Sequence, residues 1–257
     1  MGQHFLVNPR IRDKIIRCIS PEREDVILEI GAGRGEMTFP LAEKAGRVVA
    51  VEADSTLARK LKERSPDNVQ IINRDILELD FENLIPADKT KATGNLPYSI
   101  SSPILFKILA HSRFFTECHL LLQKEVAERL VAVPGSKAYA PVSAFLQNIY
   151  SIQIQFFLSP GNFSPPPKVY SAFVSLIKRK CPLFPEAGSR SFQNFLNRAF
   201  QHRRKTLVNN LKAMGVPPDK SISALRDAGL PPAIRPEKVS LECFVKLFNL
   251  IYTLENR

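Results

Sequence analysis

A short apolar run leads directly into three closely spaced glycines near residue 30. The run DVILEI, residues 25–30, is followed by GAGRG, which places glycines at positions 31, 33 and 35. An apolar run of this length that ends at turn residues is typical of a buried strand. Glycines at alternate positions allow a tight turn and let a ligand approach the bare backbone. The feature therefore predicts a strand, a ligand-binding turn and a helix, which together form one unit of an open α/β sheet.

Strand-like and helix-like segments alternate over the first 180 residues. Further strands are expected at 47–52, 69–75, 91–95, 117–123, 151–158 and 169–180, and helices at 36–46, 54–65, 102–112, 124–132 and 140–150. Such alternation predicts a mostly parallel sheet with helices on both faces. The last two strands are joined without a helix, so we expect an antiparallel hairpin at one end of the sheet.

The pattern changes near residue 181. Beyond this point four helices and no strand are expected, at 191–200, 203–215, 219–229 and 240–254. The sequence therefore predicts a catalytic α/β domain over residues 1–180 and a small all-helical domain over residues 181–257. A chain of 257 residues is long enough for this arrangement.

The charge of the chain indicates a polyanionic partner. The net charge is +11, with 24 basic and 19 acidic residues in 1–180 and 12 and 6 in 181–257. Nucleic acid is the first candidate partner and an anionic membrane surface the second. No apolar run reaches the roughly 18 residues of a membrane-spanning helix, and the start lacks the apolar segment of a signal peptide.

The cysteines and histidines argue against a disulfide framework and a metal site. The four cysteines are scattered without a CxxC pair, and the histidines lack metal-ligand spacing. Reduced thiols of this kind fit a cytoplasmic protein. We therefore expect no metal.

Two carboxylates follow the second and third expected strands. Glu52 closes one strand and Asp75 the next. The carboxyl ends of parallel strands meet at one edge of the sheet, where open α/β proteins bind ligands. Glu52 could accept the two hydroxyls of a ribose, and Asp75 the exocyclic amine of an adenine. With only Arg34 available for a pyrophosphate, and GxGxG in place of GxGxxG, the loop favours S-adenosylmethionine over a nicotinamide dinucleotide.

The uncharged stretch GNLPYSISSP, residues 94–103, follows the fourth strand at the same edge. An adenine amine is a weak nucleophile, and two oxygen acceptors for its N–H groups would orient it for attack on a methyl group. The side chain of Asn95 could supply one oxygen, and the backbone carbonyl of Leu96, held by Pro97, the other. The ring of Tyr98 could stack on the base. Phe163, before three prolines, could supply a second stacking face for an unpaired adenine.

These motifs resemble a known family over essentially the whole chain. GQHFL, EIGAGRGEMT, VEAD, GNLPYSIS, LLQKEVAERLVA, FSPPPKVYSAFV and FQHRRKTLVNNL are similar to the adenine N6,N6-dimethyltransferases of small-subunit ribosomal RNA. The resemblance implies a Rossmann-like, S-adenosylmethionine-dependent methyltransferase sheet with a helical carboxyl-terminal domain. It also implies dimethylation of two adjacent adenosines in the 3′-terminal hairpin loop of 16S-type RNA, within the small ribosomal subunit, by a monomer.

The resemblance assigns roles to individual residues. It implies that the cofactor is bound by His4, Leu6, Gly31, Glu52, Asp75 and Asn95. The methyl-transfer point is expected at Asn95, Leu96, Pro97 and Tyr98, with Phe163 completing the base pocket. The basic cluster Arg203, Arg204 and Lys205, at an expected helix start, is expected to meet RNA phosphates.

Several alternatives remain at this stage. The chain could be a ribosome-assembly protein without turnover, or a nicotinamide-dependent dehydrogenase, although the glycine spacing disfavours the latter. A DNA adenine methyltransferase or a 23S ribosomal RNA methyltransferase is a rival within the same chemistry. The sequence does not separate a bacterial source from an organellar one.

Overall fold

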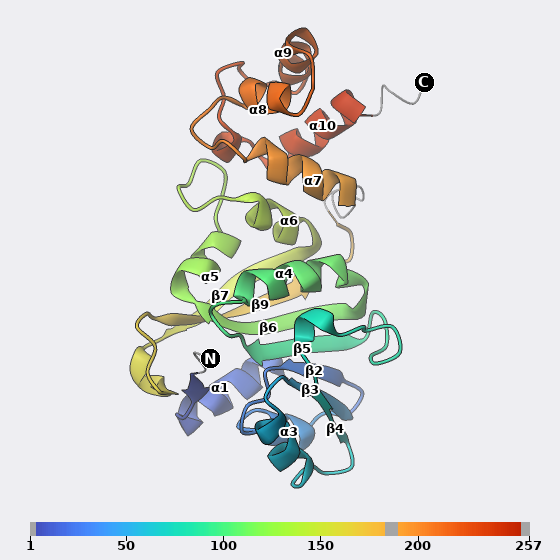
Figure 1. Cartoon of the computed structure of the whole chain (residues 1–257), viewed down its shortest axis with the longest axis vertical. Helices are drawn as coiled ribbons and strands as arrows, with labels where there is room; N and C mark the ends of the chain where they lie inside the picture. Colours follow the sequence, from blue (N-terminus) through green and yellow to red (C-terminus); the bar gives the residue numbers. More distant parts are fainter. Residues whose placement is uncertain (1–3, 183–189, 253–257) are drawn as a thin grey trace. The chain divides into compact units, whose positions relative to one another are not determined.

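Seven strands join into one sheet in the computed structural model, which describes residues 4–182 and 190–252 (Figure 1). They are β2 (Val26–Ile30), β3 (Arg47–Glu52), β4 (Val69–Asn73), β5 (Thr90–Asn95), β6 (Phe115–Gln123), β7 (Tyr150–Leu158) and β9 (Ser171–Lys178). Both ends of each strand lie within two residues of the ends of an expected strand. Residues 2 and 3 of the first motif, and 183–189 between the expected domains, lie outside the described residues.

The strand order is β4-β3-β2-β5-β6-β9-β7. The pairs β3–β4, β2–β3, β2–β5 and β5–β6 are parallel, and β9 is antiparallel to β6. The predicted mostly parallel sheet is confirmed. The last two strands are neighbours as expected, but β9 lies inside the sheet and β7 at its edge. The chain builds outward from β2 to β4, then returns to place β5 on the other side of β2. This reversal opens a crevice at the carboxyl ends of β2 and β5.

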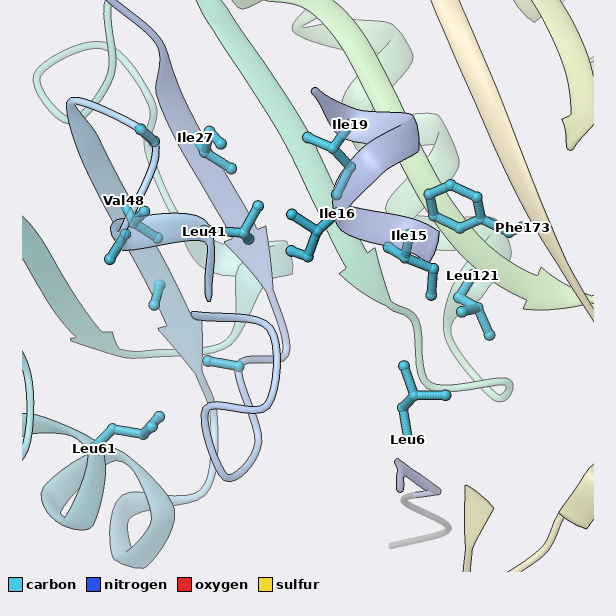
Figure 2. Packing of buried hydrophobic residues seen from close by; sticks show 14 of the residues in the cluster. Leu6, Ile15, Ile16, Ile19, Ile27, Leu41, Val48, Leu61, Leu121 and Phe173 are labelled. Atoms are coloured by element: carbon cyan, nitrogen blue, oxygen red, sulfur yellow. The ribbon is translucent and has the colours of Figure 1, made fainter. Parts of the chain in front are cut away.

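One face of the sheet is covered by a helix that the sequence analysis did not include. Helix α1 (Pro9–Ile19) begins at Asn8, whose side chain accepts hydrogen bonds from the N–H groups of Arg10 and Ile11. Its apolar side chains pack with α2 (Thr38–Ala42), α3 (Ser55–Lys62) and alternate residues of the sheet. Figure 2 shows this cluster, which includes Ile15, Ile16, Ile19, Ile27, Leu41, Val48, Leu61, Leu121 and Phe173.

The opposite face of the sheet is also covered. Cys118, Leu120 and Leu122 of β6 have no exposed surface. Leu120 and Leu122 are the neighbours of Leu121 along the strand, so they face the side of the sheet opposite to the cluster that contains Leu121. Along the chain, α4 (Ser101–Ala110) follows β5, α5 (Lys124–Leu130) follows β6, and α6 (Pro141–Ile149) precedes β7. Short 3-10 turns lie at η1 (Ile76–Glu78), η2 (Ser112–Phe114), η3 (Pro160–Asn162) and η5 (Pro236–Lys238).

A two-stranded ribbon joins the amino-terminal segment to the proline-rich loop. Strand β1 (Phe5–Leu6) pairs antiparallel with β8 (Phe163–Ser164). The Val7 N–H donates to the Asn162 carbonyl at 2.9 Å, which extends the pairing. This ribbon fixes the residues just before α1.

The chain divides into two units, Met1–Ala127 with Ile152–Lys178, and Glu128–Ser151 with Arg179–Arg257. The second unit contains the four expected helices, α7 (Arg190–Ala199), α8 (Leu207–Ala213), α9 (Pro218–Asp227) and α10 (Leu241–Tyr252). It also takes residues 128–151, which the predicted boundary at 180 assigned to the first domain, because α6 packs on α7. The Phe145 and Phe192 rings lie 5.8 Å apart there. Among the described residues, no helix has the length and apolar character needed to cross a lipid bilayer.

Candidate active site

A cavity of about 290 Å³ lies in the first unit, at the carboxyl ends of β2, β3, β4 and β5. Its wall gathers residues from β1, the glycine loop and the segments that follow these strands. The lining residues are His4, Phe5, Ile30, Gly31, Gly33, Val51, Glu52, Ala53, Arg74, Asp75, Ile76, Asn95, Leu96, Pro97, Tyr98, Ser99, Ile100 and Ile104. The cavity lies where the reversal of strand order predicts a ligand.

The glycine loop holds the carboxylate of Glu52 in a fixed orientation. The Gly33 N–H donates to one Glu52 oxygen at 2.8 Å, and the Asp54 N–H donates to the other at 2.9 Å. Gly33 has φ +61°, in the left-handed region that glycine adopts at little cost. The Glu52 side chain is buried, yet it lines the cavity. Each oxygen keeps a second lone pair, so the carboxylate can accept a pair of adjacent hydroxyl groups.

Asp75 lies at the next strand end along the cavity. One of its carboxylate oxygens accepts the Leu77 N–H at 2.9 Å, which starts the turn η1. This hydrogen bond orients the side chain while the residue as a whole stays exposed. Its neighbours Arg74 and Ile76 also line the cavity. Ile76 offers an apolar surface beside the carboxylate, a combination suited to a heterocyclic base that carries an amine.

The amide of Asn95 has a defined orientation. Its Nδ2 donates to the backbone carbonyl oxygen of His4 at 2.6 Å. The Oδ1 atom is therefore directed away from that contact and remains available as an acceptor. The preceding residue must be glycine, because a Cβ at Gly94 would overlap the carbonyl oxygen of Ile30. This close approach of β5 to β2 sets the position of Asn95 at the cavity.

The residues after Asn95 form a fixed loop. The Leu96 N–H donates to the Leu121 carbonyl at 3.1 Å, and the Leu96 side chain is 1% exposed. Pro97 accepts the Ile100 N–H at its carbonyl oxygen, also at 3.1 Å. Within the part of the chain that the structure describes, no recorded hydrogen bond ends on the Leu96 carbonyl oxygen. That oxygen can therefore accept from a ligand.

Tyr98 is anchored at its hydroxyl group. The hydroxyl oxygen lies 2.6 Å from the Oγ of Ser171. Burial raises the pKa of the Tyr98 hydroxyl, and the hydrogen bond with Ser171 partly opposes this. The ring centroid lies 5.4 Å from that of His4. Tyr98 is thus a neutral phenol that offers a ring at the cavity.

The amino-terminal segment lies along the cavity. His4 Nδ1 is 2.7 Å from the carbonyl oxygen of Pro165, so Nδ1 carries the proton. The Phe5 ring packs close to Gly33 and lies under the Arg34 guanidinium, 4.5 Å from its central carbon. The structure therefore brings together His4, Gly31, Glu52, Asp75, Asn95, Leu96, Pro97 and Tyr98 of the predicted set.

Two predicted site residues do not reach the cavity. Leu6 and Phe163 are opposite each other in the β1–β8 ribbon, with exposed fractions of 6% and 3%. Both side chains point into the hydrophobic cluster, because the pairing of these strands turns them inward. The ribbon presents Phe5 to the cavity instead. Phe163 therefore provides packing rather than a stacking face in this structure.

The basic cluster lies in the second unit, in the turn before α8 and not at the helix start. Thr206 caps α8, so residues 203–205 precede it. The Arg203 guanidinium donates to the carbonyl oxygens of Lys137 and Tyr139, both at 3.0 Å. Arg204 and Lys205 are exposed. Arg203 thus fastens the segment 137–139, and Arg204 and Lys205 present charge to solvent.

Sequence reasoning missed Phe5 and Arg74 at the cavity, and also the buried carboxyl group of Glu29. A charged residue within a buried apolar strand was the available signal for Glu29. Its side chain is 3% exposed and accepts a hydrogen bond from the Thr38 hydroxyl at 2.6 Å. The pKa of Glu29 is raised to about 8, because burial and, to a smaller extent, the charges of Glu36 and Glu52 raise it more than the Thr38 hydrogen bond lowers it. Glu29 is therefore mostly protonated near neutral pH.

The variant Glu29→Gln is expected to change how stability depends on pH. A carboxyl group whose pKa is higher in the folded state than its usual 4.5 binds a proton on folding. Its contribution to stability is therefore present at low pH and lost as pH rises from 4.5 to 8. Between pH 5 and pH 8 the free energy of unfolding of the variant should rise relative to wild type by on the order of 3 kcal/mol.

Urea unfolding of both proteins at several pH values would measure this difference. Glu36→Gln is the matched control, because its carboxylate accepts the Arg34 N–H at a half-buried position. This control keeps Glu29 and its burial, so it should retain most of the wild-type dependence of stability on pH. Parallel pH profiles for wild type and Glu29→Gln would contradict a protonated Glu29.

Comparison with known proteins identifies the family. Residues 1–252 match the model of a family described as ribosomal RNA adenine dimethylase. The chain belongs to this family. As a member, it is an adenine methyltransferase of ribosomal RNA and uses S-adenosylmethionine.

Two curated relatives are similar in sequence to this chain over nearly their whole length. The ribosomal RNA small subunit methyltransferase A of Hydrogenovibrio crunogenus is 39% identical over 259 residues, which cover 98% of this chain and 95% of the relative. The protein of that name from Xanthomonas axonopodis pv. citri is 38% identical over 252 residues, 97% of this chain and 94% of the relative.

Two solved structures resemble the dimethylase. A dimethyladenosine transferase from Plasmodium falciparum has a TM-score of 0.81 and 28% identity, covering 96% of this chain and 98% of that one. The 23S rRNA methyltransferase ErmE has a TM-score of 0.72 and 23% identity, covering 96% of this chain and 99% of that one, and shows a shared fold. The predicted methyltransferase fold is confirmed.

The cavity of the dimethylase fits its cofactor. Glu52 presents two oriented oxygens for a ribose diol, and Asp75 an acceptor beside the apolar Ile76 for an adenine. No group of histidine, cysteine or carboxylate side chains among the described residues could hold a metal ion. The oriented acceptors of Glu52 and Asp75 suit an organic cofactor with hydroxyl and amine groups.

Proposed function

We propose that this protein dimethylates two adjacent adenosines in the 3′-terminal hairpin loop of 16S-type RNA, within the small ribosomal subunit. It acts as a monomer, without a metal ion, in the cytoplasm where bacterial ribosomes assemble. The names of its bacterial relatives support the small subunit over the large one. The net charge of +11 supports a polyanionic substrate.

The orientation of Asn95 carries this proposal. Because Nδ2 is held by the His4 carbonyl, Oδ1 is the atom left to accept one N–H of the target amine. The Leu96 carbonyl oxygen accepts the other N–H, so the amine is held by two acceptors. This pairing favours an exocyclic amine over a hydroxyl, which has a single proton to donate. Stacking on Tyr98 completes the orientation of the base.

The roles of the remaining residues follow from their contacts. When bound, S-adenosylmethionine supplies an electrophilic methyl group. Glu52 binds its ribose hydroxyls, Asp75 its adenine amine, and the backbone at Gly31 and the segment at His4 enclose it. Excluding water and fixing the amine supply most of the rate enhancement, since no general base is required before transfer. The methylated amine then loses its proton to solvent.

RNA contacts outside the cavity involve the basic turn before α8. Arg204 and Lys205 are exposed and bind backbone phosphates, which fixes the register of the substrate without reading its sequence. Arg203 contributes indirectly, because its hydrogen bonds hold residues 137–139.

Methyl transfer to small-subunit particles that lack the modification tests the proposal. With labelled cofactor, we expect label in 16S-type RNA as N6,N6-dimethyladenosine at two adjacent positions, mapped by mass spectrometry. Large-subunit RNA and duplex DNA are the controls and should remain unlabelled. Tight particle binding without label transfer would indicate an assembly protein instead, and label in 23S RNA would indicate a different substrate.

A further inference from the structure

Two aromatic side chains of the first unit are exposed without a structural need. Phe157 is 50% exposed at the end of β7, and Tyr170 is 55% exposed just before β9. Among the described residues, they are the only aromatic members of the exposed large hydrophobic set; the others are Val7, Val133, Val169 and Ile177. Exposed apolar residues are common singly, whereas a contiguous exposed apolar patch marks an interaction site.

Lys124 contacts both residues, the side chain of Phe157 and the backbone of Tyr170. The backbone N–H of Lys124, the first residue of α5, donates to the Tyr170 carbonyl at 2.9 Å. The Lys124 ammonium lies 5.4 Å from the centre of the Phe157 ring. Strands β7 and β9 are neighbours in the sheet, and residues 159–170 join the end of β7 to the start of β9. Phe157, Tyr170 and Lys124 are called the stacking patch below.

The stacking patch lies next to the loop that holds the target base. Tyr170 precedes Ser171, whose hydroxyl bonds the Tyr98 hydroxyl at 2.6 Å. Ser171 pairs with Gln123, the last residue of β6. The carboxyl end of β6 lies on the same side of the sheet as the carboxyl ends of the parallel strands that line the cavity. Tyr170 is therefore one residue along the backbone from the hydrogen-bond partner of the cavity residue Tyr98.

The chemistry of the stacking patch fits unpaired nucleotides. Exposed rings can stack on any base, and ammonium groups can meet the phosphates that join them. Lys124 supplies a cation at the Phe157 ring, and the exposed Lys168 lies two positions before Tyr170. An adenosine that reaches the cavity must be unpaired, so its neighbours in the strand are also free to stack.

We propose that Phe157 and Tyr170 stack on the nucleotides that flank the target adenosine and so hold a single-stranded RNA segment at the cavity. This inference rests on the proposed function for the identity of the RNA. The stacking patch then selects looped RNA over duplex, because paired bases cannot present their faces to the two rings. It acts on RNA binding and not on the cofactor.

Serine substitutions at the two rings test this inference. Both side chains are exposed, so Phe157→Ser and Tyr170→Ser should leave the fold intact. Using the full-length protein and a fluorescent hairpin RNA with two adjacent loop adenosines, without cofactor, we expect each change to weaken binding about 10-fold and the double variant more. Affinity for S-adenosylhomocysteine should stay within twofold. Tyr170→Phe and Phe157→Tyr, which keep the rings, should bind RNA nearly as wild type does.

Ile177→Ser is the matched control, since Ile177 is 42% exposed at the far end of β9. It should leave RNA affinity unchanged. Stacking itself is measured with 2-aminopurine placed beside the target adenosine. Its fluorescence should be quenched on binding wild type and not on binding the double variant.

The outcomes separate this inference from the proposed function. If wild type methylates small-subunit RNA and the double variant binds the hairpin as tightly, the stacking patch does not hold RNA. The inference is likewise overturned if the substitutions change only self-association, measured by sedimentation, because the rings then contact a second copy. If wild type binds the hairpin through the two rings but transfers no methyl group, the stacking patch stands and the proposed function fails.

Discussion

Replacing Asn95 with alanine is expected to lower the rate of methyl transfer by about 100- to 1000-fold, a loss typical of one removed transition-state hydrogen bond. The change removes Oδ1, one of the two acceptors proposed for the target amine. The side-chain hydrogen bond of Asn95 goes to His4 and not to Glu52 or Asp75, the carboxylates proposed to bind the cofactor. Affinity for S-adenosylhomocysteine, measured by calorimetry, should therefore change by no more than a few-fold.

A second variant separates the acceptor role of Asn95 from its contact with His4. Alanine also removes the donor that holds the His4 carbonyl, whereas Asn95→Asp keeps an oxygen acceptor, loses the donor and adds a negative charge. Ser99→Ala is the matched control, because Ser99 lines the cavity in the same loop and is exposed. The control should turn over near the wild-type rate. Turnover of Asn95→Ala within tenfold of wild type would remove the assigned role.

The sheet was predictable because its information is local. Runs such as 26–30 and 47–52 are apolar, short and bounded by turns, and they form β2 and β3 at those positions. The hydrogen bonds that begin α3 are also local, because Asp54 accepts from the N–H groups of Thr56 and Leu57. The position of β9 inside the sheet is not determined by local sequence. It depends on pairing with β6, some 50 residues earlier in the chain.

The sequence analysis missed two features that involve the amino-terminal segment, helix α1 and the β1–β8 ribbon. Helix α1 is signalled by Asn8 and Pro9, but its apolar spacing is interrupted by five charged residues between positions 10 and 17. The β1–β8 ribbon joins segments about 158 residues apart and is too short to show a pattern. Its register decides that Phe5 faces the cavity while Leu6 and Phe163 face the core. A one-residue difference in register exchanges these faces, so sequence alone could not assign them.

The cavity was predictable at the level of residue types and not of atoms. Glu52 and Asp75 could be placed because the carboxyl ends of parallel strands converge. The donors to Glu52 come from Gly33 and Asp54, and the partner of Asn95 is a backbone atom of His4. These contacts decide which lone pairs remain for a ligand. Backbone partners carry no side-chain signal, and for this reason only the structure assigns the free acceptors.

Replacing Glu52 with alanine is expected to weaken cofactor binding by about 10- to 100-fold, the value of hydrogen bonds to a charged group. Alanine removes the two oriented oxygens of Glu52, which are the acceptors proposed for the ribose hydroxyls. The N–H groups of Gly33 and Asp54 would also lose their acceptor. A buried donor without a partner costs about 1 to 3 kcal/mol, so the free energy of unfolding should fall as well.

A cofactor analogue separates the ribose contact from loop damage. Wild type should bind 2′,3′-dideoxy S-adenosylhomocysteine much more weakly than the parent compound, whereas Glu52→Ala should bind the two almost equally. Glu36→Ala is the control, because its carboxylate also accepts a backbone N–H of the glycine loop, at 3.2 Å, but lies outside the cavity lining. It should keep the wild-type preference. If Glu52→Ala still discriminates between the two compounds as wild type does, the ribose hydroxyls are bound elsewhere, and the carboxylate serves only to hold the glycine loop.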